Sequence, residues 1–183
     1  MGLPLWRCTD AALPLPLYED TPFPPQEEYK WIQDYFLKQF DMMQSQSVRL
    51  MQLIAIGLGK DRDYFTEWFK DDPLSTLRAT HIQPRSKNIV DSSELNENDV
   101  KLCCTEHTDA GFVTLVSTLG YPGLQIEINN EWKSVKPIKD QIIVNLGDLL
   151  SDITNGKLHA ARHRVVDIGI MRFSAVFGLL PKY

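Results

Sequence analysis

Two spacings of hydrophobic residues divide this sequence of 183 residues. Between Gln26 and Leu58 there is no proline, and apolar residues recur every three or four positions, which is typical of an amphipathic helix. These apolar positions are Ile32, Tyr35, Phe36, Phe40, Met43, Leu50, Met51, Ile54 and Leu58. The pattern predicts one long helix over residues 26–58, or two helices separated at the polar residues 44–47.

A second, shorter helix is expected immediately afterwards. Gly57 and Gly59 end the first helical pattern, because glycine readily adopts the left-handed backbone that follows many helices. Asp61 is a residue type that caps helix starts, and Asp72-Pro73 stops helices. We therefore predict a helix from Asp61 to Phe69.

From Ser75 onward the hydrophobic period changes to two, which is typical of strands. Candidate strands lie at residues 77–82, 101–107, 112–118, 124–128, 132–135, 141–145, 161–167 and 172–177. Asn129-Asn130 and Asn155-Gly156 are residue pairs that favour hairpin turns, and the polar residues 84–99 are a predicted loop. Helices followed by many short strands predict an α+β fold whose strands form a β-sandwich or small barrel.

The start of the chain has a different composition. Residues 1–25 hold more than half of the 11 prolines, and proline is excluded from helix interiors and central strands. We predict that residues 1–25 form an irregular lead-in. Residues 26–183 are predicted to form a single domain, because a chain of this length with 43% hydrophobic residues can build one core.

Composition also excludes several classes of protein. The net charge is −5 and no basic stripe stands out, which argues against a nucleic-acid partner. No apolar run reaches the roughly 18 residues of a membrane span, and the N-terminus lacks the pattern of a secretory signal. The three cysteines form no disulfide framework, so we expect a reducing, cytoplasmic location. The oligomeric state cannot be read from the sequence.

One short motif carries candidate chemistry. His107 and Asp109 are separated by one residue at the end of a predicted strand, so both side chains point to the same face. His163, in another predicted strand, is the best third ligand among the four histidines. Two imidazoles and one carboxylate form the facial triad of non-haem Fe(II) oxygenases, which leaves coordination positions open for chemistry. An ordinary structural role for the histidines, or a hydrolytic zinc site, stays open at this point.

The surrounding residues resemble a known family. The segment His107-Thr-Asp-Ala-Gly-Phe-Val-Thr-Leu115 looks like the first ligand motif of the 2-oxoglutarate and Fe(II)-dependent dioxygenases, in their isopenicillin N synthase-like branch. Further landmarks follow in the order of that family: Gly123–Ile126, Trp132–Pro137, Val144–Asp148, Thr154–Gly156, His163–Val165 and Arg172–Ser174. The resemblance covers roughly residues 22–181.

The resemblance implies a fold and a set of roles. The fold is a double-stranded β-helix, or jelly-roll, core with the N-terminal long helix packed on it. The implied iron ligands are His107, Asp109 and His163. Arg172 would pair with the far carboxylate of 2-oxoglutarate through the planar fork of donors of its guanidinium. Ser174 would donate a hydrogen bond from its hydroxyl to the same carboxylate. The implied reaction uses O2 and 2-oxoglutarate to hydroxylate, desaturate or cyclise a small organic substrate.

Two features depart from the family. Ile82 stands where many relatives carry a tyrosine that helps to bind 2-oxoglutarate, and isoleucine donates no hydrogen bond. Relatives are also usually longer at both ends, so we interpret the chain as a partial gene product or a reduced family member. Two alternatives therefore stay open: an Fe(II) oxidase of the isopenicillin N synthase type that does not use 2-oxoglutarate, and an inactive metal-binding fragment. His159, where the family often has lysine, is left out of the ligand set.

Overall fold

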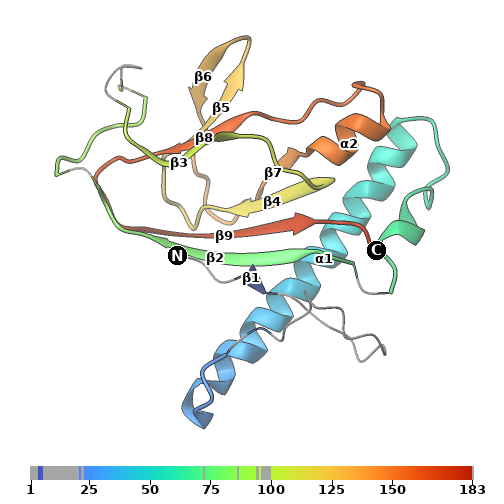
Figure 1. The fold of residues 1–183 in the computed structure, drawn as a ribbon, viewed down its shortest axis with the longest axis horizontal. Helices are drawn as coiled ribbons and strands as arrows, with labels where there is room; N and C mark the ends of the chain where they lie inside the picture. Colours follow the sequence, from blue (N-terminus) through green and yellow to red (C-terminus); the bar gives the residue numbers. More distant parts are fainter. Residues whose placement is uncertain are drawn as a thin grey trace. The chain divides into compact units, whose positions relative to one another are not determined.

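Contacts within the chain form two compact units, and Figure 1 labels the helices and strands of both. The computed structural model describes residues 4–5, 21, 23–71, 73–85, 87–93, 95 and 100–182. One unit, which we term the helical unit, consists of Leu3–Arg78 and Phe177–Tyr183. The other, which we term the strand unit, consists of Met1–Gly2 and Ala79–Val176. The boundaries predicted from the sequence, a lead-in over residues 1–25 and one domain over residues 26–183, stay predictions. Most of the proline-rich lead-in lies outside the described residues.

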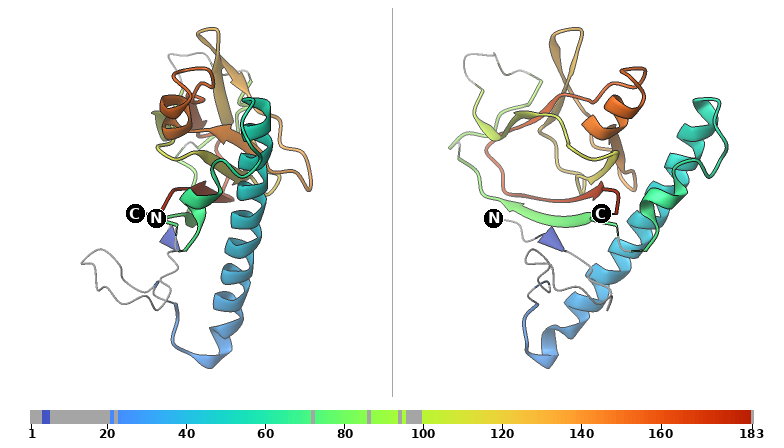
Figure 2. Two further views of the ribbon diagram at one scale, coloured as in Figure 1. Left: turned by 90° about the vertical axis from the view of Figure 1, so that its right-hand side faces the viewer. Right: turned by 45° about the vertical axis from the view of Figure 1, so that its right-hand side comes forward.

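The long helix of the helical unit is continuous (Figure 2). Helix α1 spans Lys30–Gly57, and the 3-10 turn η1, Glu27–Tyr29, precedes it. The predicted break near residues 44–47 is wrong, because no proline or glycine interrupts the helix there and Ser47 is itself fully buried. The buried face consists of Phe40, Met43, Ser47, Met51 and Ala55. Tyr35, counted with the apolar positions, is instead 54% exposed.

The predicted second helix is wrong in kind. Asp61–Phe69 forms turns followed by the 3-10 helix η2, Thr66–Phe69, and not an α-helix. Side-chain hydrogen bonds hold this segment: Gln52 of α1 donates to the Asp63 carboxylate over 2.8 Å, and Thr66 donates to the same oxygen over 3.2 Å. These contacts favour a turn over the helical conformation that Asp61 predicted.

The end of the chain completes the helical unit. Phe177, on strand β9 (Arg172–Leu179), packs edge-on against Phe40 of α1 with 5.4 Å between ring centroids. The Leu74 amide donates to the Pro181 carbonyl, and the Lys182 amide donates to the Trp68 carbonyl. Strand β1, Pro4–Leu5, pairs antiparallel with β2, Thr76–Ile82, at the edge of its sheet, where proline is tolerated.

Two sheets built mainly of antiparallel pairs carry the strands. The remaining strands are β3 (Leu102–His107), β4 (Val113–Ser117), β5 (Leu124–Ile128), β6 (Glu131–Ser134), β7 (Ile143–Leu146) and β8 (His163–Val166). One sheet has the order β1-β2-β9-β4-β7 and the other the order β3-β8-β5-β6. All eight predicted strands are therefore confirmed, with ends shifted by at most two residues. Apart from the hairpin of β5 and β6, neighbours in each sheet are not consecutive in the described chain or lie far apart in it, as expected for a jelly roll.

Turn chemistry was predicted correctly at one of two positions. Asn129 and Asn130 both adopt positive φ (53° and 62°) between β5 and β6, as a two-residue hairpin requires. Asn155-Gly156 is not a hairpin turn, because the short helix α2, Asp148–Ile153, precedes it; both residues have positive φ and end that helix. Helix α2 was not predicted.

Within the described ranges, no helix combines the length and the hydropathy that a membrane crossing requires.

Candidate metal centre

Two histidines face each other across neighbouring strands of the strand unit. β3 and β8 run antiparallel and lie side by side (Figure 1), and the Cα atoms of His107 and His163 are partners in the register. Their ring centroids are 4.3 Å apart. Directly opposite residues on one face of a sheet bring their side chains together, so the pairing of two strands creates this histidine pair.

Backbone carbonyls orient both imidazole rings. The Nδ1 atom of His107 lies 2.7 Å from the Thr105 carbonyl oxygen, and the Nδ1 atom of His163 lies 2.8 Å from the Ala161 carbonyl oxygen. A carbonyl only accepts, so each Nδ1 donates its proton there, and in a neutral imidazole this leaves the lone pair on Nε2. A carbonyl partner on the distal nitrogen is the usual support of a metal-binding histidine.

The carboxylate of Asp109 completes the cluster. Its Oδ1 atom lies 3.6 Å from Nε2 of His107 and 3.8 Å from Nε2 of His163. The candidate ligand atoms of the three residues all lie within 4.8 Å of one another, and no other such group of three occurs among the described residues. Two neutral nitrogens and one carboxylate oxygen suit Fe(II). The donor set thus fits the metal that the sequence resemblance implies.

The Asp109 side chain is held by a residue to which sequence reasoning gave a structural role. Asn145, on β7, donates a hydrogen bond of 2.7 Å from its amide nitrogen to Oδ2 of Asp109. The sequence favours strand-end packing for Asn145 over a position lining the site. A polar amide inside the apolar strand Ile-Val-Asn-Leu was the available signal, because a polar residue in such a strand needs a partner.

The loop that carries Asp109 is anchored on the same segment. The Asp148 amide donates to the Asp109 carbonyl over 2.8 Å, and the Gly147 amide donates to the Phe112 carbonyl over 3.0 Å. The Thr108 hydroxyl donates to the Asp148 carboxylate over 3.0 Å. The backbones approach so closely that a Cβ atom on Gly147 would lie 2.2 Å from the Gly111 carbonyl oxygen.

Arg172 lies in the interior of the strand unit. Its side chain is only 5% exposed, and the guanidinium donates to the carbonyls of Pro122 (2.8 Å) and Val166 (2.9 Å). These bonds use only part of its five N–H donors. Burial raises the pKa of the neighbouring Cys103 thiol, and the positive charge of Arg172 opposes that shift. Arg172 is thus a buried cation fixed by backbone oxygens.

Ser174 and Ile82 share the face of Arg172. Ser174 is two residues from Arg172 on β9, so both side chains point to the same side of the sheet, and Ser174 is half-buried. On the other side, Phe173 stacks on His81 of β2 with 4.5 Å between centroids. Alternation then places Ile82, next to His81, on the face of Arg172 and Ser174.

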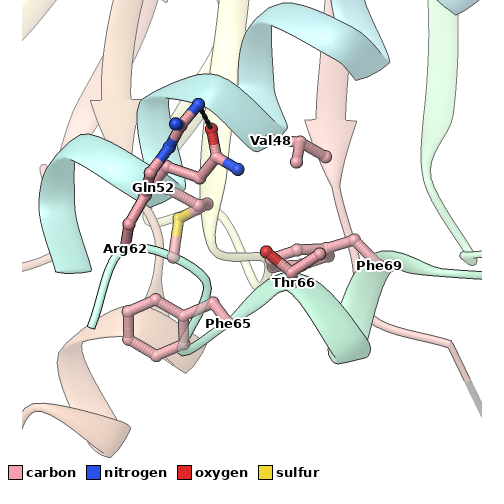
Figure 3. A pocket seen from close by; sticks show the side chains of 7 residues that line it. Val48, Gln52, Arg62, Phe65, Thr66 and Phe69 are labelled. Carbon is pink, nitrogen blue, oxygen red and sulfur yellow. Dashed lines mark hydrogen bonds between the residues drawn. The ribbon is translucent and has the colours of Figure 1, made fainter. Parts of the chain in front are cut away.

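Two further features can be compared with the candidate ligands. His159 is exposed and belongs to no cluster of three metal-binding groups among the described residues. A pocket of the helical unit lies between α1 and the segment that follows it, beside the hydrogen bond from Arg62 to Gln52 (Figure 3). The pocket is too small to hold a water molecule.

Comparisons with known proteins agree with the resemblance seen in the sequence. The model of the 2OG-Fe(II) oxygenase superfamily matches residues 75–181. Gibberellin 20 oxidase 4 of Arabidopsis thaliana is 29% identical over 155 residues, which are 84% of this chain and 38% of that protein. The clavatol oxidase of Penicillium crustosum is 34% identical over 156 residues, which are 84% of this chain and 43% of that protein.

A solved structure shares the fold. A full-length Neurospora crassa protein in complex with alpha-KG superimposes with a TM-score of 0.80 and 26% sequence identity, covering 99% of this chain and 55% of that one. The predicted α+β jelly-roll fold with a long N-terminal helix is confirmed. The chain spans about two fifths of the curated relatives and just over half of the solved one.

Proposed function

The chain belongs to the 2OG-Fe(II) oxygenase superfamily, and on that premise we propose that it forms the catalytic centre of an Fe(II)- and 2-oxoglutarate-dependent oxygenase. The observation that carries the proposal is the convergence of Nε2 of His107, Oδ1 of Asp109 and Nε2 of His163. Three ligands from one side leave the opposite positions of the metal open. The substrate is a small organic molecule, as the names of the relatives suggest.

The overall reaction balances without a further reductant. One 2-oxoglutarate and one O2 give succinate and CO2, and the second oxygen atom enters the substrate or leaves as water. Fe(II) and 2-oxoglutarate supply the oxidising chemistry when they are bound. The protein's part is to orient these molecules and to exclude water.

Arg172 and Ser174 are the proposed partners of the far carboxylate of 2-oxoglutarate. A buried guanidinium already fixed by two carbonyls is pre-organised, so little side-chain entropy is lost when a carboxylate binds. Its burial strengthens the attraction to the anion, because the surroundings screen the charge less than water does. The Ser174 hydroxyl adds a second donor on the same face.

A second candidate function rests on Ile82. This residue lies on the face of Arg172 and Ser174 and offers no donor, so the same pair is also suited to a carboxylate of the substrate itself. That is the oxidase of the isopenicillin N synthase type. Calorimetry with 2-oxoglutarate on the anaerobic Fe(II) protein separates the two, because 1:1 binding favours the oxygenase and no binding favours the oxidase.

The main experiment measures succinate. We expect the protein supplied with Fe(II), 2-oxoglutarate, O2 and ascorbate to form succinate, even without its substrate, at a slow uncoupled rate. Ascorbate then supplies the two electrons that convert the second oxygen atom to water, in place of the substrate. His107→Ala removes one metal ligand and is expected to abolish succinate formation. His159→Ala is the matched control, because it removes an exposed histidine outside the cluster and leaves the rate unchanged.

The outcomes distinguish the proposals. Succinate that depends on His107 but not on His159 supports the oxygenase. Binding of Fe(II) without succinate or oxygen uptake would overturn it in favour of an inactive metal-binding fragment.

A further inference from the structure

We propose that Asn145 is a positioning residue, which makes Oδ1 of Asp109 the metal ligand and withholds Oδ2. The inference rests on the proposed metal centre and adds a residue from a different sheet. β7 carries Asn145 in the five-stranded sheet, whereas β3 and β8 carry the histidines in the four-stranded sheet. The centre would therefore be assembled from both sheets.

The two oxygens of Asp109 have different surroundings. Oδ1 faces both Nε2 atoms, at 3.6 Å and 3.8 Å, and Oδ2 accepts the Asn145 amide at 2.7 Å. A carboxylate oxygen only accepts, so the amide nitrogen of Asn145 must be the atom that faces it. The Asp109 side chain is 22% exposed, so water competes only partly for this bond.

Withholding one oxygen has a chemical consequence. An unrestrained carboxylate can bind a metal through both oxygens, which would fill one of the positions that the reaction needs open. An N–H donor on Oδ2 disfavours this mode, because the hydrogen bond would have to break. Outer hydrogen bonds of this kind typically change metal affinity by about 10-fold to 100-fold when they are removed.

The position of Asn145 is itself fixed. In the register of β4 and β7 it is the partner of Thr114, which is buried. Two residues further on, Gly147 and Asp148 hold the backbone of the Asp109 loop. One short segment thus fixes both the main chain and the side chain of Asp109, which limits the freedom of the carboxylate to turn.

The test uses Co(II), whose visible absorption depends on coordination number. Wild type, Asn145→Ala and Asn145→Ser are titrated with Co(II) under anaerobic conditions. Gln52→Ala is the matched control, since it removes another hydrogen bond from a side-chain amide to a carboxylate, that of Asp63, in the helical unit. We expect both Asn145 variants to bind Co(II) about 10-fold to 100-fold more weakly and with an altered spectrum. Gln52→Ala should keep the affinity and spectrum of the wild type.

Thermal unfolding of each variant separates positioning from stability. If Asn145→Ala unfolds below the assay temperature, the comparison is made with Asn145→Ser, which keeps a polar side chain. Wild-type affinity and spectrum in the folded Asn145 variants would overturn the inference alone. Failure of the wild type to bind Co(II) would overturn the proposed function and, with it, this inference.

Discussion

At the scale of single residues, the side chain at position 82 bears on the proposed binding of 2-oxoglutarate. Ile82 lies on the face of Arg172 and Ser174, where a tyrosine would add a hydroxyl donor. A hydrogen bond to a charged acceptor contributes about 1.5–3 kcal/mol, which is about 10-fold or more in affinity.

We predict that Ile82→Tyr tightens the binding of 2-oxoglutarate about 10-fold. Calorimetry on the anaerobic metal-loaded protein measures this change. Ile82→Phe introduces the same ring without the hydroxyl, so it controls for the added bulk. If tyrosine and phenylalanine change the affinity equally, the hydroxyl does not reach the co-substrate.

Sequence reasoning at this scale succeeded where the backbone determines direction. Alternation along a strand was sufficient to group His107 with Asp109, and Arg172 with Ser174. It was not sufficient for Asn145, because its partner Asp109 lies in the loop after β3 and no local pattern specifies that this loop meets β7. The carbonyl partners of Arg172 were missed because no local pattern specifies which backbone segments meet β9.

At the scale of elements, the Asp109 loop depends on a close approach of two backbone segments. Gly147 lies where a Cβ atom would be 2.2 Å from one carbonyl oxygen and 2.7 Å from another. Neither contact is relieved by a side-chain movement, because both oxygens belong to the backbone of the loop.

We therefore predict that Gly147→Ala lowers the free energy of unfolding by about 2–3 kcal/mol. It should also weaken metal binding, because the loop must move away. Urea denaturation measures the first effect. Gly57→Ala is the control: no atom lies within 4 Å of a Cβ there and its φ is not positive, so we expect a change of less than about 1 kcal/mol. Equal losses in the two variants would contradict this account of the loop.

Elements were predictable in proportion to their length and regularity. Alternation predicted all eight strands, and α1 followed from its long periodic pattern. The six residues of α2 are too few to show a helical period, and helices of this length form through tertiary packing, here the fully buried Leu150. For residues 61–69 the error was the reverse, because a helix was predicted and turns with a 3-10 helix were found. The hydrogen bond from Gln52 to Asp63 favours the turn there.

At the scale of the whole molecule, a bound metal links parts of the chain that are distant in sequence. The family match over residues 75–181 includes both histidines and the carboxylate. A ligand that binds only the folded state stabilises it by about 2.7 kcal/mol when present at a hundred times its Kd. The three proposed ligands come from β3, the loop after it and β8, so they converge only when the strands are paired.

We predict that Co(II) at a hundred times its Kd raises the unfolding midpoint of the wild type by about 5–10 °C, the shift expected for a chain of this size. A chelator should reverse the shift, and differential scanning calorimetry measures it. His163→Ala should lose the shift, because two ligands remain and the link between β3 and β8 is broken. His159→Ala should keep it in full. A shift that survives in His163→Ala would place the ion elsewhere, and the convergence of His107, Asp109 and His163 would then be a feature of sheet packing alone.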